Sequence, residues 1–292
     1  MNFSDTAQLP DALCFLNGQF IPLREARVSV LDRGFIFGDG IYDVVPVYDH
    51  KLFRFDAHMA RLERGLKELR IPNPFDRPGW LDRIRRLVAS QTASDQIVYI
   101  QVTRGVALRD HAMPADIAPT VFMMTNPLKP ANPTLREQGV ACVTAQDFRW
   151  ARGDIKSVSL LGNVLARQIS ADVGAVETIL LRDGWLTEGS GSNVWVVQGG
   201  TVLAPPRSPY ILEGIRLALV EQLCADEGIA LQMRPVSEHE LRQADELMLS
   251  SASKELLPVS SLDGHAVGTG KPGPVYQALF QAYQRAKATQ ST

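Results

Sequence analysis

The sequence has few cysteines, no long hydrophobic run and little net charge. Its three cysteines are Cys14, Cys142 and Cys224, and their wide spacing without a Cys-x-x-Cys pair argues against a disulfide framework or a zinc site. No segment approaches the roughly 18 uninterrupted apolar residues of a membrane span, and the N-terminal segment lacks the basic and apolar regions of a signal peptide. The formal net charge of −2 gives no electrostatic reason to expect nucleic acid or an anionic membrane as a partner. These absences predict a cytoplasmic protein with reduced cysteines and neither kind of partner.

The glycine pattern excludes two common nucleotide-binding motifs. Gly38-Asp39-Gly40 is not the Gly-x-Gly-x-x-Gly that follows a strand in dinucleotide-binding folds, and the chain has no Gly-Lys-Ser/Thr P-loop. With 292 residues, of which 45% are hydrophobic and 21% charged, the chain has an ordinary globular composition. It is long enough for one large or two medium domains.

Apolar periodicity in the first part predicts a β-rich domain that also contains two helices. The Asn17-Gly18 pair suits the tight turn of a hairpin. Met59, Leu62 and Leu66 recur at helical spacing after Asp56, which we predict to be the N-cap of that helix. The predicted elements are a hairpin over 14–21, strands over 40–48, 97–103 and 120–125, and helices over 54–69 and 80–89.

A proline-rich segment predicts the boundary between two domains. Three prolines within residues 126–133 favour an extended connector. We therefore predict a smaller N-terminal domain over 1–125, a linker over 126–135 and a larger C-terminal domain over 136–292. Hairpins mixed with segregated helices favour an α+β fold over a doubly wound parallel sheet. In the second domain we predict strands over 140–144, 177–181, 193–197, 201–204 and 246–250, and helices over 160–173, 214–227, 238–244 and 274–288.

Lys156 and Glu188 form the most informative pair in the chain. Lys156 is one of only seven lysines and stands just before an apolar run that begins at Val158. Partial burial there would lower the pKa of its amine and make it nucleophilic enough to attack an aldehyde. Glu188, 32 positions later, could keep a pyridine nitrogen protonated, and the Gly/Ser loop that follows offers close backbone approach and hydroxyl donors. These are the groups that pyridoxal phosphate chemistry requires.

Two segments could bind the phosphate of such a cofactor. The segment from Leu212 to Arg216 has the pattern of a helix start, whose free N–H groups attract an anion. The turn from Ser250 to Ser253 offers hydroxyl groups. Each segment alone is a weak signal.

Six short motifs, which occur in order along the chain, are specific as a set. They are Arg33-Gly-Phe-Ile-Phe-Gly-Asp-Gly-Ile-Tyr-Asp43, His58-Met-Ala-Arg-Leu62, Gln101-Val-Thr-Arg-Gly105, Asp154-Ile-Lys-Ser157, Leu186-Thr-Glu-Gly-Ser-Gly-Ser-Asn193 and Leu212-Glu-Gly-Ile215. Together they resemble the signature of the fold-type IV pyridoxal-phosphate family, and the likeness runs from about Phe15 to Lys287. The family contains D-amino acid aminotransferases, branched-chain aminotransferases, aminodeoxychorismate lyases and (R)-selective amine transaminases.

The resemblance implies a role for each candidate residue. Lys156 would hold pyridoxal 5′-phosphate as a Schiff base and move the proton between the substrate carbon and C4′ of the cofactor, while Glu188 would pair with the pyridine nitrogen. Five further residues would bind the phosphate and one would pack on the ring. They are Arg61, the backbone groups at Ile215 and Arg216, and the serine turn near Ser251 and Ser253 at the phosphate, with Leu212 at the ring.

The chain departs from many of its relatives at two positions in these segments. Arg216 and Ala252 stand where those relatives have threonine. Hydroxyl contacts to the phosphate would be missing as a result. The Arg216 guanidinium either compensates for them or points to solvent.

The loop from Leu108 to Pro114 discriminates between branches of the family. Its Arg-x-His pattern resembles the D-amino acid aminotransferase loop, in which the arginine and histidine reach the neighbouring subunit's site and join a tyrosine like Tyr42. Arg109 can bind a carboxylate bidentately, and His111 and Tyr42 can donate further hydrogen bonds. The resemblance thus implies a homodimeric aminotransferase that transfers the amino group of D-alanine-type substrates to 2-oxoglutarate in two ping-pong half-reactions.

Three alternatives remain open. A branched-chain L-aminotransferase would need an apolar side-chain pocket, which Phe35, Phe37 and Trp150 could line, and would act on L-leucine. An (R)-amine transaminase or an aminodeoxychorismate lyase would accept amines without a carboxylate or release pyruvate from the chorismate derivative. A non-catalytic homologue would bind the cofactor without reacting with any amino donor.

Overall fold

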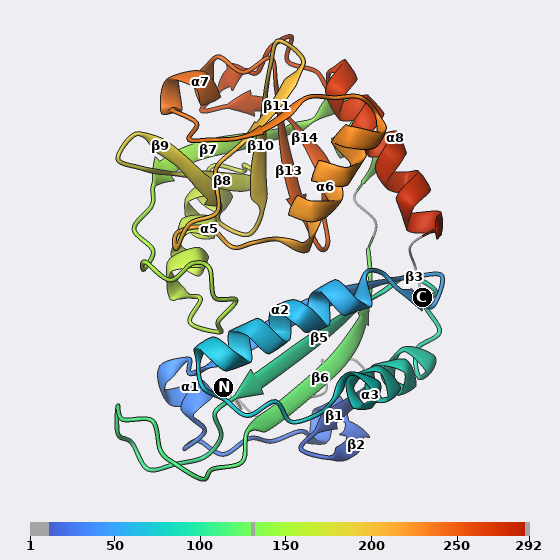
Figure 1. Ribbon diagram of the computed structural model, residues 1–292, viewed down its shortest axis with the longest axis vertical. Helices are drawn as coiled ribbons and strands as arrows, with labels where there is room; N and C mark the ends of the chain where they lie inside the picture. The colour runs from blue at the N-terminus through green and yellow to red at the C-terminus, as the bar shows by residue number, and fades with distance from the viewer. Residues whose placement is uncertain (1–11, 130–131, 290–292) are drawn as a thin grey trace. The chain divides into compact units, whose positions relative to one another are not determined.

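The structure, a computed structural model, describes residues 12–129 and 132–289, which fall into two units (Figure 1). The first unit comprises the described residues up to Lys129 together with Ile155–Ser159, and the second comprises the other described residues. The break after Lys129 falls inside the segment predicted as a linker, 126–135. Residues Ile155–Ser159 differ from the predicted boundaries, because Ile155 is buried in the core of the first unit and Ser157 forms a bridge with Ile41.

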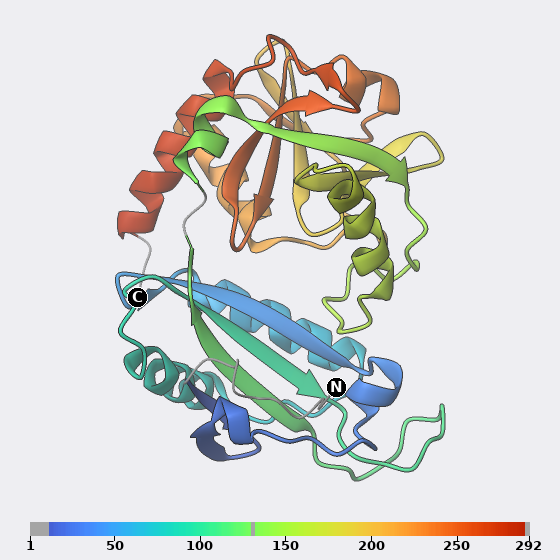
Figure 2. The same ribbon diagram turned by 180° about the vertical axis from the view of Figure 1, so that it is seen from behind.

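A six-stranded antiparallel sheet forms the framework of the first unit, in the order β2-β1-β6-β5-β3-β4. Its strands are β1 (Leu13–Leu16), β2 (Gln19–Pro22), β3 (Gly40–Tyr48), β4 (Lys51–Leu52), β5 (Gln96–Thr103) and β6 (Thr120–Pro127). Its helices are α1 (Arg33–Phe37), α2 (Phe55–Glu68) and α3 (Arg77–Ala89), and a 3-10 turn covers Leu23–Glu25. Helices α2 and α3 lie on one face of the sheet (Figures 1 and 2).

Local sequence signals explain most of this unit. Asn17 and Gly18 have φ angles of 47° and 93°, which Asn and Gly tolerate best and which the β1–β2 turn requires. Met59, Leu62 and Leu66 are buried in the core that α2 forms with the sheet, as the helical spacing predicts. The N-cap prediction for Asp56 is wrong. Arg54 occupies the cap position in a left-handed conformation, and Asp56 lies in the first turn. The Asp56 carboxylate still interacts favourably with the helix dipole there.

A nine-stranded mixed sheet forms the framework of the second unit. Its main path runs β12-β11-β10-β13-β14-β7-β8-β9, with β15 paired to β14. The pairs β11–β12, β14–β7 and β7–β8 are parallel and the other pairs are antiparallel. The strands are β7 (Val140–Gln146), β8 (Glu177–Arg182), β9 (Trp185–Gly189), β10 (Asn193–Gln198), β11 (Thr201–Ala204), β12 (Leu231–Met233), β13 (Glu246–Ser251), β14 (Glu255–Leu262) and β15 (His265–Ala266). The helices are α4 (Pro133–Gln138), α5 (Leu161–Asp172), α6 (Ile215–Asp226), α7 (Glu238–Arg242) and α8 (Pro274–Thr289). The α+β fold class is confirmed.

Helix α4 and strand β14 are among the elements of the second unit that the sequence analysis does not predict. Part of the predicted extended connector is helix α4, because Asn132 accepts a hydrogen bond from the Thr134 N–H and Pro133 occupies the first turn, where no N–H is required. Strand β14 is not predicted from the sequence, since Pro258 lacks the N–H that an interior strand position uses. Pro258 stands opposite Met248 of β13, and the pairing with β7 begins only at Val259, after the proline.

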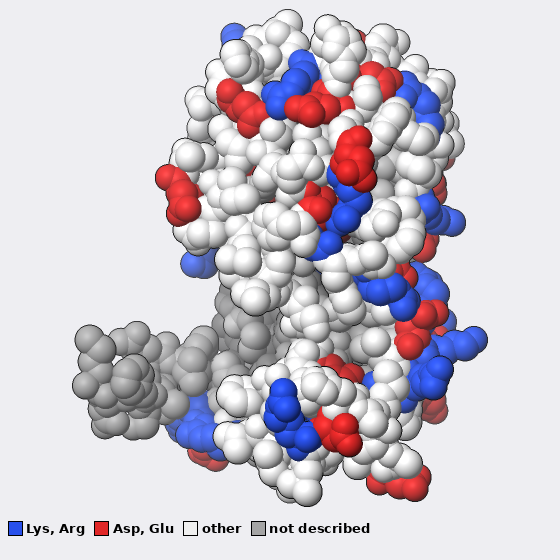
Figure 3. All heavy atoms as spheres, turned by 90° about the vertical axis from the view of Figure 1, so that its left-hand side faces the viewer, with Lys and Arg blue, Asp and Glu red and all other residues white. Residues whose placement is uncertain are grey.

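Both units have their own hydrophobic core, and charge is mixed on the surface. On the face shown in Figure 3, acidic and basic side chains are interspersed rather than separated by sign. Cys14, Cys142 and Cys224 are free and buried, and burial is the main reason why the pKa of Cys142 rises to about 12. Among residues 12–129 and 132–289, no helix has both the length and the apolar character that a membrane crossing needs.

Candidate active site

Lys156 lies beside Tyr42 in the first unit. The backbone carbonyl of Lys156 accepts a hydrogen bond from the Tyr42 N–H at 3.0 Å, so the segment is fixed along strand β3. The Lys156 Nζ lies 4.0 Å from the centroid of the Tyr42 ring, and the side chain is half-buried. The Tyr42 ring in turn stacks on Tyr99 at a centroid distance of 5.8 Å. The structure therefore brings together two residues that the sequence analysis assigned to the same site.

Arg61 belongs to a buried ionic cluster around Asp43, the residue that follows Tyr42 on β3. Its Nε and Nη2 donate hydrogen bonds to the two carboxylate oxygens of Asp43, both at 2.9 Å. The His58 Nδ1 lies 2.7 Å from the Asp43 Oδ1, and all three side chains are buried. Burial alone would raise the pKa of Asp43, but Arg61 and His58 hold it well below its usual range. Asp43 therefore fixes the position of the Arg61 side chain, which projects from α2.

Asp43→Asn is expected to lower the free energy of unfolding by about 3–5 kcal/mol near neutral pH, because it removes the buried carboxylate that balances Arg61 and His58. The folded-state pKa of Asp43 is depressed. Its stabilisation is therefore fully present above the unfolded pKa of about 3.9 and is lost as the pH falls below that value. Urea unfolding of wild type and variant across pH should show a difference that shrinks below about pH 4.

Asp56→Asn is the matched control for this prediction, because Asp56 lies on α2, the helix that carries His58 and Arg61, with 83% of its side chain exposed. It should change the free energy of unfolding by less than about 0.5 kcal/mol. A loss in Asp43→Asn that is as small as in the control, or that persists undiminished in acid, would show that the cluster does not stabilise the fold in this way.

Arg109 and His111 both contact Phe37. The Arg109 guanidinium carbon lies 5.5 Å from the centroid of the Phe37 ring, and the His111 ring lies 5.4 Å from it. Both side chains are exposed, and their loop is anchored by Arg33, whose Nη1 donates to the Asp110 carbonyl at 2.5 Å. The two predicted carboxylate-binding residues therefore share one aromatic support and a fixed loop backbone.

Glu188 is buried on strand β9 in the second unit, with 6% of its surface exposed. Its Oε2 accepts a hydrogen bond from the Leu212 N–H at 3.1 Å, and its Oε1 accepts one from the Arg149 Nη1 at 2.5 Å. The Leu212 carbonyl also accepts a hydrogen bond from the Asn193 Nδ2 at 3.0 Å. Two residues of the Leu186–Asn193 motif thus hold the backbone of Leu212, so these predicted cofactor-binding residues lie together.

Helix α6 begins shortly after Leu212, and its first turn has no side-chain cap. Gly214 is the N-cap residue, and a Cβ atom there would lie 2.1 Å from the Asn193 amide oxygen, so a larger residue would displace the Asn193 side chain. Ile215 and Arg216 are the first two helical residues. The suggestion that Arg216 points to solvent is wrong, because it is 2% exposed and its Nε donates to the Tyr283 hydroxyl at 3.3 Å.

The serine turn is tied to the loop after Glu188 through Glu177. The Ser251 Oγ accepts a hydrogen bond from the Lys254 N–H at 3.1 Å, and the Lys254 Nζ contacts the Glu177 Oε2 at 2.8 Å. Glu177 is fully buried and also accepts hydrogen bonds from the hydroxyls of Ser190 and Ser192. Ser253 lies exposed in the same turn. Glu177 and Lys254 were not predicted from the sequence, because a charge pair 77 positions apart leaves no local signal.

Arg149 and Asp147 are two further residues that the sequence analysis did not identify. The Arg149 Nε and Nη2 donate to the two Asp147 carboxylate oxygens, each at 2.9 Å, while its Nη1 reaches Glu188. Burial would lower the pKa of the Arg149 guanidinium, but the hydrogen bonds to Asp147 and the attraction of Glu188 raise it above its usual value. An Asp-x-Arg pattern at a strand end is too common to indicate this pairing.

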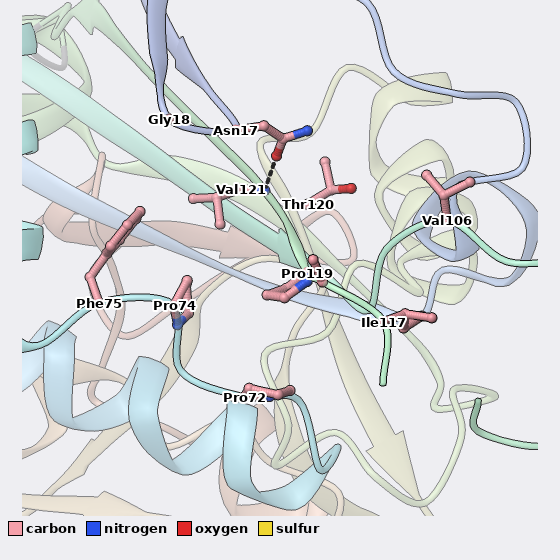
Figure 4. A pocket seen from close by; sticks show the side chains of 11 residues that line it. Asn17, Gly18, Pro72, Pro74, Phe75, Val106, Ile117, Pro119, Thr120 and Val121 are labelled. Atoms are coloured by element: carbon pink, nitrogen blue, oxygen red, sulfur yellow. Dashed lines mark hydrogen bonds between the residues drawn. The ribbon is translucent and has the colours of Figure 1, made fainter. Parts of the chain in front are cut away.

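A cavity of about 720 Å³ lies elsewhere in the first unit (Figure 4). It is lined largely by apolar residues such as Pro74, Phe75 and Pro119, and Asn17 accepts a hydrogen bond from the Val121 N–H at 2.8 Å on its rim. None of its lining residues has a titratable side chain, and none is a candidate site residue. The cavity therefore has no charged side chain that could form an ion pair with a phosphate or a carboxylate.

Comparison with known families and relatives gives a consistent result. A family model described as amino-transferase class IV matches residues 40–262. The chain is 39% identical over 269 residues to a D-alanine aminotransferase from Bacillus licheniformis, covering 92% of this chain and 94% of the relative. It is 38% identical over 272 residues to a D-alanine aminotransferase from Staphylococcus aureus (strain MSSA476), covering 93% and 96%.

Solved structures with a similar fold include branched-chain amino acid aminotransferases. The Escherichia coli structure has a TM-score of 0.90 at 24% identity and covers 94% of each chain, a likeness that establishes the fold alone. A second branched-chain enzyme, solved in complex with N-(5′-phosphopyridoxyl)-L-glutamate, has a TM-score of 0.87 at 26% identity and covers 95% of this chain and 94% of the other.

Proposed function

The chain belongs to the amino-transferase class IV family, and from that premise we propose that it is a pyridoxal-phosphate-dependent D-amino acid aminotransferase. It would transfer an amino group between a D-amino acid of the D-alanine type and a 2-oxo acid such as 2-oxoglutarate. The observation that carries this proposal is the 39% and 38% identity to D-alanine aminotransferases over more than nine-tenths of the chain.

The candidate residues suit pyridoxal 5′-phosphate. Lys156 supplies an amine above the Tyr42 ring, and Glu188 supplies a buried carboxylate. The first turn of α6 begins at Gly214 without a side-chain cap, and N–H groups in that situation bind phosphate. The branched-chain enzyme in complex with a phosphopyridoxyl compound has the same fold. The donor set therefore fits the cofactor.

We assign the following roles to the chain's own residues. When bound, pyridoxal 5′-phosphate supplies an aldehyde carbon that takes up amino groups and a ring that withdraws electrons. Lys156 would hold that carbon and would move a proton to and from the substrate carbon, and Glu188 would accept the hydrogen bond of the ring N–H. The remaining cofactor contacts are Leu212 at the ring and Arg61, Ile215, Arg216, Ser251 and Ser253 at the phosphate.

Arg109→Ala is expected to raise the KM for D-alanine about tenfold to a hundredfold with a smaller change in kcat, because a charge-assisted carboxylate contact contributes about 1.5–3 kcal/mol. Together with His111 and Tyr42, Arg109 would hold the substrate carboxylate. Steady-state kinetics with D-alanine test this assignment. Arg85→Ala, at an exposed position of α3, is the control and should leave KM at the wild-type value. An unchanged KM in Arg109→Ala would rule out the carboxylate contact.

We also propose that the protein is a homodimer, which the exposed apolar face of α5 supports. Leu161, Val164 and Leu165 are 72%, 60% and 52% exposed. Their spacing places them on one side of the helix, together with Ile169. Contiguous apolar surface of this kind is typical of subunit contacts, and a second copy of the chain is the occupant that would also let Arg109 and His111 reach a neighbouring site.

The double variant Val164→Asp/Leu165→Asp is expected to weaken the dimer about 100-fold or more, since each added carboxylate would be buried without a partner. Light scattering coupled to size exclusion measures the mass. Asp172→Asn, at an exposed position of the same helix, is the control and should remain dimeric. A fully active wild-type monomer would contradict the shared site.

The branched-chain L-aminotransferase is the second candidate, and the likeness to a branched-chain enzyme at 26% identity favours it. Of the residues that could line its apolar pocket, Phe35 and Trp150 are 73% and 50% exposed in the single chain, whereas Phe37 contacts Arg109 and His111. High activity with L-leucine and none with D-alanine would favour this candidate.

A cytoplasmic location remains part of the proposal. Three buried thiols are compatible with a reducing compartment. Fractionation of the producing cells, with detection of the intact chain, would test it.

A further inference from the structure

A buried ionic cluster stands directly behind Glu188. Arg149 joins the Glu188 carboxylate at 2.5 Å to the Asp147 carboxylate, which it contacts twice at 2.9 Å. All three side chains are at most 8% exposed. The cluster lies wholly within the second unit and includes no residue with an assigned catalytic role other than Glu188.

The orientation of the Arg149 guanidinium is fixed from several sides. Its Nη2 also donates to the Tyr210 carbonyl at 3.0 Å. The Asp147 carboxylate is itself held by the Thr187 hydroxyl at 2.9 Å and by the Arg149 N–H at 3.1 Å. Only the Nη1 end of the guanidinium is directed at Glu188. Because a guanidinium is planar and rigid, Glu188 is presented with a donor whose position Asp147 determines.

We propose that Arg149 is a positioning residue, which holds Glu188 in the rotamer and ionised state that the ring nitrogen of the cofactor requires. This inference rests on the proposed function of Glu188. The Leu212 N–H binds Oε2 and Arg149 binds Oε1, and each carboxylate oxygen can accept a second hydrogen bond. Fixed donors on both oxygens therefore set the direction in which the Glu188 carboxylate would face a ring N–H.

The charge balance of the cluster agrees with this role. Asp147, Arg149 and Glu188 sum to one negative charge, and a buried carboxylate is kept ionised by an adjacent cation. Arg182 is another cation near the cluster, with its Nη2 3.5 Å from the Asp147 Oδ1 and a quarter of its side chain exposed. It contacts Asp147, the Arg149 carbonyl and the Tyr210 ring. Replacing Arg182 also removes an arginine that contacts Asp147. It is therefore the matched control for replacing Arg149.

The test compares the binding of two cofactors to the apoprotein. One is pyridoxal 5′-phosphate and the other is its 1-deaza analogue, which has carbon in place of the ring nitrogen. The ratio of the two dissociation constants measures the contact between Glu188 and the nitrogen without any turnover. The set of proteins is the wild type, Glu188→Gln, Arg149→Met, the Arg149→Met/Glu188→Gln double variant and Arg182→Met.

The wild type should prefer pyridoxal 5′-phosphate, and Glu188→Gln should lose most of that preference. Arg149→Met should reduce the preference about tenfold or more, and the double variant should be no worse than Glu188→Gln alone, because Arg149 acts through Glu188. Arg182→Met should keep the wild-type ratio. A merely structural role for Arg149 would weaken both cofactors equally and leave the ratio intact.

Several results would overturn the proposal. Arg149→Met with the wild-type ratio, or a double variant whose loss is the sum of the single losses, would show that Arg149 does not act through Glu188. If Glu188→Gln itself keeps the ratio, the proposed contact of Glu188 with the nitrogen fails instead. Should Arg149→Met not fold, Arg149→Lys is used. Lysine keeps the positive charge but cannot bridge Asp147 and Glu188 as a planar guanidinium does. An intermediate ratio of the two dissociation constants therefore supports the positioning role, and a full wild-type ratio contradicts that role.

Discussion

Lys156→Ala should lower the rate of D-alanine transamination by about 10⁴-fold or more. The variant loses both the amine that binds the aldehyde carbon and the group that moves the proton, and proton transfer alone contributes about 10²–10⁴-fold. The fold should be unaffected, because the contacts that fix the segment are made by the backbone of Lys156 and by its neighbours Ile155 and Ser157. Single-turnover kinetics with the holoprotein, together with its melting temperature, measure both effects.

Two further variants separate the nucleophile from the positive charge. Lys156→Arg keeps a cation near the Tyr42 ring but cannot take up the aldehyde, so it should be as inactive as Lys156→Ala. Lys67→Ala removes an exposed lysine of α2 and should retain wild-type activity. Substantial activity in either Lys156 variant would show that another residue carries the chemistry.

Glu188→Gln is expected to reduce kcat by about 10²–10³-fold with a modest change in KM. The amide has the same shape but no charge, so the stabilisation of the protonated ring nitrogen during the reaction is lost, and a buried electrostatic contact of this kind contributes about 2.7–4 kcal/mol. Steady-state kinetics and the pH profile of kcat would measure it. A wild-type kcat in the folded variant would exclude Glu188 from the ring nitrogen.

The comparison with Glu188→Ala distinguishes catalysis from stability. Alanine also removes the acceptor of the Arg149 Nη1 and of the Leu212 N–H, and a buried donor left without an acceptor costs about 1–3 kcal/mol. Glu188→Ala should therefore unfold at lower urea concentration than Glu188→Gln, while both have similarly low kcat. Equal stability of the two variants would show that Arg149 finds another partner.

Local signals in the sequence predicted most elements of the fold. The Asn17-Gly18 turn and the helical spacing of Met59, Leu62 and Leu66 depend on neighbours along the chain, so a single sequence reveals them. The assignment of Ile155–Ser159 to the first unit could not be predicted. It depends on the bridge from Ser157 to Ile41, and no local pattern encodes contacts between such distant segments.

The candidate site was predictable to a similar extent. Lys156 and Glu188 stand in short motifs whose residue types match the chemistry, so the sequence alone is enough to select them. Arg149 could not be selected in this way, because its role follows from a contact with Glu188 across 39 positions. For the Arg216 guanidinium, the sequence left two possibilities open, compensation for the missing hydroxyl groups or exposure to solvent. An arginine is usually exposed, and only the packing of α6 against Tyr283 shows that this one is buried.

The visible absorption spectrum of the purified holoprotein, recorded before and after D-alanine is added without any oxo acid, tests the central claim most directly. If the protein is a D-amino acid aminotransferase that acts through Lys156, D-alanine alone should discharge the absorption band of the lysine-bound cofactor, and L-leucine should not. Discharge by L-leucine but not by D-alanine would contradict the account and assign the chain to the branched-chain aminotransferases. A band unchanged by both would exclude both aminotransferase activities.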